Sequence, residues 1–256
     1  MNSKLMKVDR LSFSYGATTI LSDISFEIEE GTYNTIIGPN GSGKTTLLNL
    51  VTRQLKESSG SIQYRGRKLQ DMKIKDTAKE IAVIYQNTIC NFPYTCFEAV
   101  LMGLHPHIAR FEKVGEEQLK QVEEVLRLTG AIHLAEKELT NISGGELQRV
   151  LLARSLVQNP KLLIIDEAMS DLDISAKFQM NQLLNELKKK NKMSILAIHH
   201  DLNIAFNYSD QIMALQNGKL AACGSPDELL NHSFFSKVFD VDIQIYPNNR
   251  FVIYKE

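Results

Sequence analysis

The stretch GPNGSGKT, residues 38–45, decides the fold. It satisfies the pattern G-x₄-G-K-[ST] at every fixed position, after an apolar strand predicted over residues 34–37 and before a helical pattern over residues 45–55. Glycines at such a bend let backbone N–H groups surround phosphate oxygens, and the helix N-terminus adds positive potential. The stretch therefore predicts a phosphate-binding loop, in which Lys44 supplies a charge and Thr45 offers a hydroxyl to Mg²⁺.

A pair of carboxylates supplies the second half of the predicted site. A buried strand is predicted over residues 162–165, and it ends in the adjacent Asp166 and Glu167. Neighbouring side chains on a strand point in different directions, so the two carboxylates can have different roles. We expect Asp166 in the Mg²⁺ shell, and Glu167 to accept a proton from, or at least orient, the attacking water.

Strand and helix periods alternate along the rest of the chain. Residues 8–28 alternate apolar and polar positions, which predicts an antiparallel β-hairpin layer. Between about residues 87 and 139 the strand signal fades, and apolar residues at helical spacing predict an inserted helical lobe. After Gly144, helices predicted over residues 148–157 and 176–190 alternate with buried strands. The chain is therefore expected to be α/β, with a parallel-sheet core, an N-terminal antiparallel layer and a helical lobe.

The C-terminal part carries a turn signal and a helix-start signal. Asn217-Gly218 predicts a tight hairpin, and Ser225 with Pro226 and Glu228 predicts a capped helix start. Two final strands are predicted over residues 241–246 and 251–254.

Composition excludes several classes of protein. The 256 residues carry 29 basic and 30 acidic side chains, a balance that disfavours a nucleic-acid binder. The longest apolar run has five residues, whereas a membrane-spanning helix needs about 20. Residues 1–10 contain no apolar stretch of the ~7–15 residues that a secretory signal requires. Cytosolic residence is the resulting expectation. Cys90, Cys96 and Cys223 lack the spacing of a zinc site, so we expect buried free thiols.

The stretch NISGGELQR, residues 141–149, resembles the signature motif of ABC transporter ATPases, usually written L-S-G-G-x-x-Q-R. The family's order of motifs extends over nearly the whole chain. The resemblance implies an ABC-type nucleotide-binding domain over residues 1–256. Its RecA-like core with the antiparallel layer would comprise residues 1–86 and 141–256, and its helical lobe residues 87–140.

The resemblance also assigns roles to single residues. Tyr15 is similar to the aromatic residue that stacks on adenine, and Gln86 to the glutamine that links Mg²⁺ and water to the helical lobe. His200 resembles the switch histidine that contacts the γ-phosphate, and residues 170–173, which end at Asp173, resemble the loop that crosses the dimer interface. Ala168-Met169 stands where the family usually has Pro-Thr, a change expected to affect turnover more than nucleotide binding.

These assignments complete the expected site. The expected ATP-binding residues are Tyr15, Gly38, Pro39, Asn40, Gly41, Ser42, Gly43, Lys44, Thr45, Thr46, Ser143, Gly144, Gly145 and Glu146. The expected catalytic residues are Glu167, His200 and Gln86, the expected Mg²⁺ ligands are Thr45, Gln86 and Asp166, and the expected dimer-interface residues are Ser143 and Asp173.

The family's geometry implies a function for two distant anion sites on one chain. Two copies pack head to tail as a homodimer and enclose two ATP molecules, so that ATP favours the closed state. Residues 102–107, 200–205 and 235–239 most resemble importers of iron-siderophores, haem and cobalamin, although zinc and manganese importers share much of this pattern.

The expectation is therefore an ATPase subunit held peripherally at the cytoplasmic face of the cell membrane. Its partners would be transmembrane permease subunits and, indirectly, an extracytoplasmic substrate-binding protein, with no nucleic acid. The alternatives are a soluble ABC-type ATPase acting on nucleic acid or ribosomes, and a small-molecule kinase.

Overall fold

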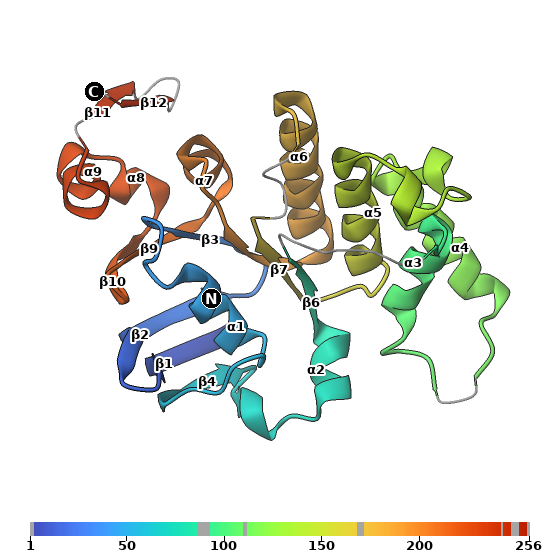
Figure 1. Cartoon of the computed structure of the whole chain (residues 1–256), viewed down its shortest axis with the longest axis horizontal. Helices are drawn as coiled ribbons and strands as arrows, with labels where there is room; N and C mark the ends of the chain where they lie inside the picture. The colour runs from blue at the N-terminus through green and yellow to red at the C-terminus, as the bar shows by residue number, and fades with distance from the viewer. Residues whose placement is uncertain are drawn as a thin grey trace. The chain divides into compact units, whose positions relative to one another are not determined.

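A computed structural model describes residues 3–85, 93–109, 112–167, 172–241, 243–246 and 251–254. The chain forms two compact units, which we call unit 1 (Met1–Met72 with Lys188–Glu256) and unit 2 (Lys73–Leu187). Both contain strands and helices, which confirms the α/β class (Figure 1).

An antiparallel sheet begins unit 1 and confirms the expected N-terminal layer. Its strand order is β2-β1-β4-β5, with bounds β1 (Lys4–Tyr15), β2 (Thr18–Glu29), β4 (Ser59–Tyr64) and β5 (Arg67–Lys68). Val8 of β1 lies opposite Phe26 on one side and Ile62 on the other. The strand β4 was not predicted, because its first residues, Ser59 to Ser61, carry a turn signal rather than a strand signal.

The strand that precedes the phosphate loop lies in the parallel part of unit 1. The bounds are β3 (Tyr33–Ile37), β8 (Ser194–Ile198), β9 (Gln211–Gln216) and β10 (Lys219–Gly224). β3 pairs in parallel with β8 and with β9, and β10 pairs antiparallel to β9. Asn217 and Gly218 connect β9 and β10 with φ values of 49° and 72°, which confirms the predicted tight hairpin.

The other elements of unit 1 follow these strands. They are α1 (Lys44–Val51), η1 (Leu69–Asp71), α7 (Leu202–Tyr208), α8 (Pro226–Leu229), α9 (His232–Phe239), β11 (Ile243–Tyr246) and β12 (Phe251–Tyr254). The predicted cap of α8 is confirmed, because Ser225 and Glu228 form a reciprocal capping box. Helix α1 ends at Val51, earlier than predicted. Arg53 is left-handed, with φ 62°, and its guanidinium donates to the carbonyls of Gln70 and Met72.

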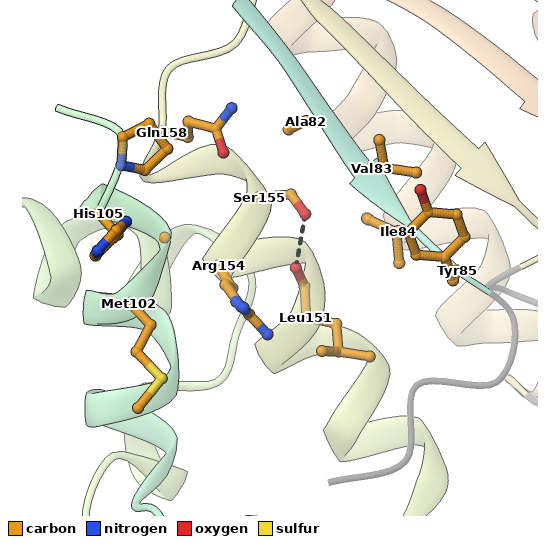
Figure 2. A pocket seen from close by; sticks show the side chains of 12 residues that line it. Ala82, Val83, Ile84, Tyr85, Met102, His105, Leu151, Arg154, Ser155 and Gln158 are labelled. Atoms are coloured by element: carbon orange, nitrogen blue, oxygen red, sulfur yellow. Dashed lines mark hydrogen bonds between the residues drawn. The ribbon is translucent and has the colours of Figure 1, made fainter. Parts of the chain in front are cut away.

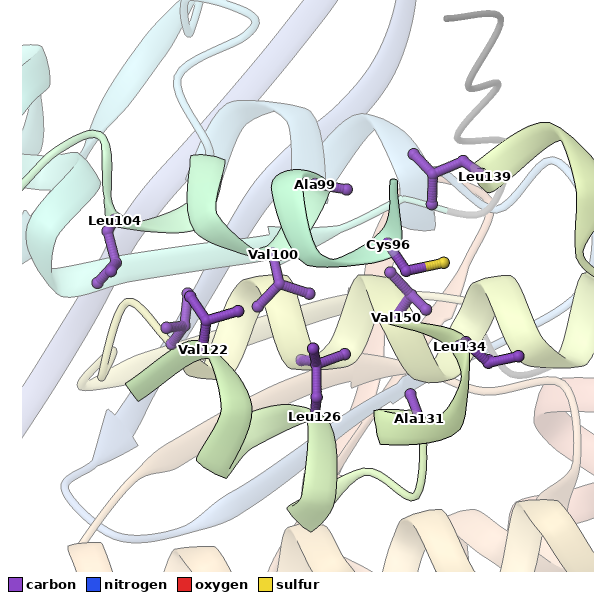
Figure 3. Close-up of a cluster of buried hydrophobic side chains, with 12 residues drawn as sticks. Cys96, Ala99, Val100, Leu104, Val122, Leu126, Ala131, Leu134, Leu139 and Val150 are labelled. Carbon is purple, nitrogen blue, oxygen red and sulfur yellow. The ribbon is translucent and has the colours of Figure 1, made fainter. Parts of the chain in front are cut away.

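Unit 2 contains two parallel strands and most of the helices. Its elements are α2 (Ile74–Glu80), β6 (Ile81–Ile84), α3 (Cys96–Leu101), η2 (Met102–Leu104), α4 (Glu116–Leu128), η3 (Ile132–Leu134), η4 (Leu139–Asn141), α5 (Gly144–Leu156), β7 (Leu162–Asp166) and most of α6 (Ile174–Asn191). The helices α3, α4 and α5 enclose one apolar cluster that includes Val100, Val122, Leu126 and Val150 (Figure 3). The helical spacing in the sequence identified Val122 and Leu126, the buried residues of α4, whereas Leu119, which falls at the same spacing, is 38% exposed.

The environments of the cysteines differ from the expectation in one case. Cys96 is buried in this cluster, whereas Cys223 is exposed on β10, an edge strand of its sheet. Cys90 lies outside the described residues. No helix in the described ranges is both long enough and apolar enough to cross a membrane.

Candidate functional site

The phosphate loop of unit 1 has the backbone geometry that its glycines allow. Gly38, Gly41 and Gly43 adopt φ values of 148°, 76° and 101°. A side chain at Gly38 would collide with the carbonyl oxygen of Leu215, so glycine is required there by space as well as by conformation. Gly43 is the N-cap of α1 and provides no side-chain cap, so the first amides of this helix remain available to an anion.

The Lys44 ammonium lies inside this loop. Its Nζ donates to the carbonyl oxygens of Gly38 at 3.0 Å and Pro39 at 3.1 Å, and the residue is 6% exposed. Ser42 is also buried, and its hydroxyl has no hydrogen-bond partner among the residues that the structure describes. A buried hydroxyl without a partner costs free energy that a bound phosphate oxygen would recover. The residues of the loop thus fit a phosphate group.

Thr45 and Thr46, the two residues after Lys44, lie in the first turn of α1. Thr45 is exposed and Thr46 is half-buried. A hydroxyl at this position suits the oxygen coordination that Mg²⁺ prefers.

A cavity of about 250 Å³ lies beside the loop within unit 1. Its walls are formed by Gly38, Pro39, Asn40, His199, His200, Leu202 and Phe239. The structure therefore brings the predicted switch residue His200 to the phosphate loop, although more than 150 residues separate them in the sequence. Phe239, the last residue of α9, was not identified from the sequence, because no local pattern relates it to the loop.

The predicted signature residues form the N-terminus of α5 in unit 2. Ser143 is the N-cap: its Oγ accepts a hydrogen bond from the Glu146 amide at 3.3 Å, and its own amide donates to Glu146 Oε2 at 2.8 Å. Hydrogen bonds from the backbone and then the side chain of Ser143 hold the pKa of Glu146 below its usual range. Glu146 is therefore a carboxylate that fixes the helix start.

Gly144 and Gly145 differ in what surrounds them. A Cβ at Gly144 would meet no atom within 4 Å, whereas one at Gly145 would lie 3.4 Å from the Leu172 side chain. No packing among the described residues requires glycine at 144, where it costs helix stability relative to alanine. The space over Gly144 is open to a molecule outside the chain.

The predicted carboxylates lie at and after the end of β7. Asp166 is the last residue of this strand and is buried. Glu167 is half-buried and has a left-handed backbone with φ 49°, a conformation that is unfavourable for a residue other than glycine and concentrates at functional sites. Asp173 is exposed, and its Oδ1 accepts a hydrogen bond from the Ala176 amide at 2.7 Å at the start of α6.

Two further expectations have different outcomes. Tyr15 ends β1 and is 54% exposed, with its ring edge-on to Phe13 at 4.7 Å, so it belongs to the surface and not to the core. Gln86 lies outside the described residues, and so does Ala168-Met169.

A second cavity, of about 560 Å³, lies in unit 2 between β6, η2 and α5; we call it the lobe groove. Figure 2 shows Met102 and His105 on one side, the β6 side chains on the other, and Arg154 and Ser155 of α5 between them. The Ser155 hydroxyl is occupied, because it donates to the Leu151 carbonyl within α5. The Met102 side chain is 39% exposed at the groove. Sequence reasoning did not identify this groove, because its walls come from three separate segments.

Comparisons with known proteins agree with this arrangement. The family model described as ABC transporter matches residues 21–170. The iron(3+)-hydroxamate import ATP-binding protein FhuC of Bacillus subtilis is 32% identical over 98% of this chain and 92% of the relative. The hemin import ATP-binding protein HmuV of Methylobacillus flagellatus is 32% identical over 93% of this chain and 90% of the relative.

A solved structure of a putative metal-chelate type ABC transporter in an inward-facing conformation superposes with a TM-score of 0.84. It is 24% identical over 99% of this chain and 97% of that chain, so this likeness shows the fold alone. The family match and the curated relatives carry the assignment further. This chain belongs to the ABC transporter family, as an ATP-binding subunit with ATPase activity.

Proposed function

We propose that this chain is the ATP-hydrolysing subunit of a membrane importer for iron-siderophores, haem or cobalamin. The observation that carries the proposal is the similarity to hydroxamate and hemin import proteins over more than nine-tenths of the chain. The phosphate loop and His200 lining one cavity support the chemical part of the proposal.

Nucleotide capture is assigned to the phosphate loop. The backbone N–H groups of the loop between Asn40 and Thr46 and the Lys44 ammonium hold the phosphate oxygens, and Tyr15 presents its exposed ring to adenine. Thr45, Asp166 and Gln86 would hold Mg²⁺, which would neutralise charge on the phosphates.

Hydrolysis is assigned to Glu167 and His200. Glu167 orients a water and accepts its proton as the water oxygen bonds to the γ-phosphorus. The bond from the γ-phosphorus to the bridging oxygen breaks, and ADP and inorganic phosphate are the products. His200 contacts the γ-phosphate from the wall of the 250 Å³ cavity.

Two copies of the chain act as a homodimer. The N-terminus of α5, with Ser143, Gly144 and Gly145, approaches the nucleotide held by the phosphate loop of the other copy, while Asp173 lies in the interface. The open space over Gly144 supports this, because a phosphate group can approach the backbone closely there. ATP favours the closed dimer, and hydrolysis removes that preference.

The permease is assigned to the lobe groove in unit 2. Met102 is exposed at this groove, and methionine side chains adapt to irregular apolar partners. A cytoplasmic segment of the permease inserts there, which holds the subunit peripherally at the cytoplasmic face of the membrane. The substrate-binding protein takes part only through the permease.

The variant Glu167→Gln tests the hydrolytic assignment. It removes the proton acceptor and keeps the shape, so we expect hydrolysis to fall by about 10²-fold or more while MgATP binding persists. ATP-bound dimers should then accumulate in size-exclusion chromatography. The control is Glu186→Gln on the exposed side of α6, which should behave as the wild type. Hydrolysis at the wild-type rate in Glu167→Gln contradicts the role of Glu167.

A further inference from the structure

Two adjacent histidines connect β8 to α7, and the structure gives them opposite environments. His200 is exposed and lines the cavity beside the phosphate loop. His199 is 7% exposed. The two residues follow β8 directly and share one peptide bond, so the backbone that places the His199 side chain also places that of His200. The orientation of His200 therefore depends on what holds His199.

His199 is held by Tyr33. The Tyr33 hydroxyl and His199 Nε2 are 2.9 Å apart, and the two rings stack with centroids 6.1 Å apart and an interplanar angle of 26°. Tyr33 is fully buried. On the other side of His200, the Asp201 carboxylate caps α7 by accepting a hydrogen bond from the Asn203 amide at 2.9 Å. His200 is thus fixed between two anchored residues.

The strand β3 connects this anchor to the phosphate loop. Tyr33 is the first residue of β3, and Ile37, its last, is followed directly by Gly38. β3 pairs in parallel with β8, with Tyr33 opposite Ile195 and Ile36 opposite Ile198. We propose that the Tyr33–His199 pair is a positioning device, which fixes His200 relative to the phosphate loop through β3. The inference rests on the proposed function, in which His200 contacts the γ-phosphate.

The charges around the pair agree with a positioning role. Burial lowers the pKa of His199 to about 4, with opposing effects of Asp201, which raises it, and His200, which lowers it further. Burial also raises the pKa of Tyr33, and Tyr208 adds to that effect. Both members of the pair are therefore neutral at pH 7, so the pair orients its neighbour without contributing charge to the phosphates.

The first test is Tyr33→Phe in the full chain, with steady-state MgATP hydrolysis as the assay. The change removes one hydroxyl and conserves the ring, so we expect kcat to fall about tenfold, because small misplacements of reacting groups are costly. The KM for MgATP should stay within about twofold. Tyr64→Phe is the matched control, because Tyr64 is also a buried tyrosine but lies on β4. The kcat of this variant should equal that of the wild type. An unchanged kcat in Tyr33→Phe, or a raised KM alone, overturns the inference.

Substitutions at His199 separate positioning from a merely structural role. His199→Gln keeps a hydrogen-bonding group for the Tyr33 hydroxyl and should retain most of the wild-type kcat. His199→Leu has no such group, so its kcat should fall as far as that of Tyr33→Phe. The double variant Tyr33→Phe/His199→Leu should be no worse than His199→Leu, because the two residues act as one unit. Additive losses contradict the inference. If His200→Ala itself leaves kcat unchanged, the proposed role of His200 fails, a result distinct from failure of the pair.

Discussion

Lys44→Met measures what the buried ammonium contributes to nucleotide binding. The substitution keeps a straight side chain of similar length and removes the charge. In the structure Nζ lies 3.0 Å and 3.1 Å from the carbonyl oxygens of Gly38 and Pro39. An ammonium about 4 Å from a unit negative charge gains about 4 kcal/mol at an effective dielectric constant of about 20. When the ammonium turns to the phosphate, its hydrogen bonds to the two loop carbonyls weaken, which costs about 1.5–3 kcal/mol and reduces the net gain.

The difference, about 2 kcal/mol, corresponds to a roughly 30-fold weaker Kd for MgATP. The assay is calorimetric titration in the Glu167→Gln background, which suppresses turnover. Lys4→Met is the control, because Lys4 forms an exposed ion pair with Glu27 on the antiparallel sheet, and its Kd should be unchanged. A Kd for Lys44→Met within threefold of the reference value would refute the assignment of Lys44.

Two further predictions concern stability. The pKa of His199 is about 4 in the folded chain, below its unfolded value of about 6.5, so the unfolded state binds the extra proton first. The free energy of unfolding should therefore fall by about 3 kcal/mol through His199 as pH decreases from about 6.5 to 4. In urea unfolding, the His199→Gln variant should not show this pH-dependent decrease. Leu126 lies in the apolar cluster of Figure 3, so Leu126→Ala should lower the free energy of unfolding in urea by about 2–5 kcal/mol. Leu128 is 46% exposed, so Leu128→Ala should lower it by less than about 0.5 kcal/mol. Equal losses would contradict the packing of α4.

The part of the fold around the phosphate loop could be predicted because its determinants are local. The buried β3, the glycines of the loop and the start of α1 are consecutive, and each constrains the backbone directly. The same holds for the hairpin at Asn217-Gly218 and the capping box at Ser225. By contrast, Arg53, just after the end of α1, donates hydrogen bonds to the carbonyls of residues 17 and 19 positions away, and no local pattern records such contacts.

The candidate site divides in the same way. Motifs identified the loop, the N-cap at Ser143 and the carboxylate at Asp166 from short patterns. The Tyr33–His199 bond joins residues 166 positions apart, and Phe239 reaches the cavity only through the packing of α9, where its ring lies 6.1 Å from that of Phe235. Such contacts follow from tertiary packing and leave no periodic signal in the sequence.

Capture of the membrane partner tests the importer proposal most directly. Tagged Glu167→Gln chain is incubated with MgATP and detergent-solubilised membranes, and captured proteins are identified by mass spectrometry. Met102→Glu in the lobe groove and Leu128→Glu, exposed on α4, are compared in the same background. We predict a polytopic membrane protein in stoichiometric amount, lost with Met102→Glu and retained with Leu128→Glu. Ribosomal or DNA-associated proteins with no membrane partner would contradict the importer and support a soluble ATPase.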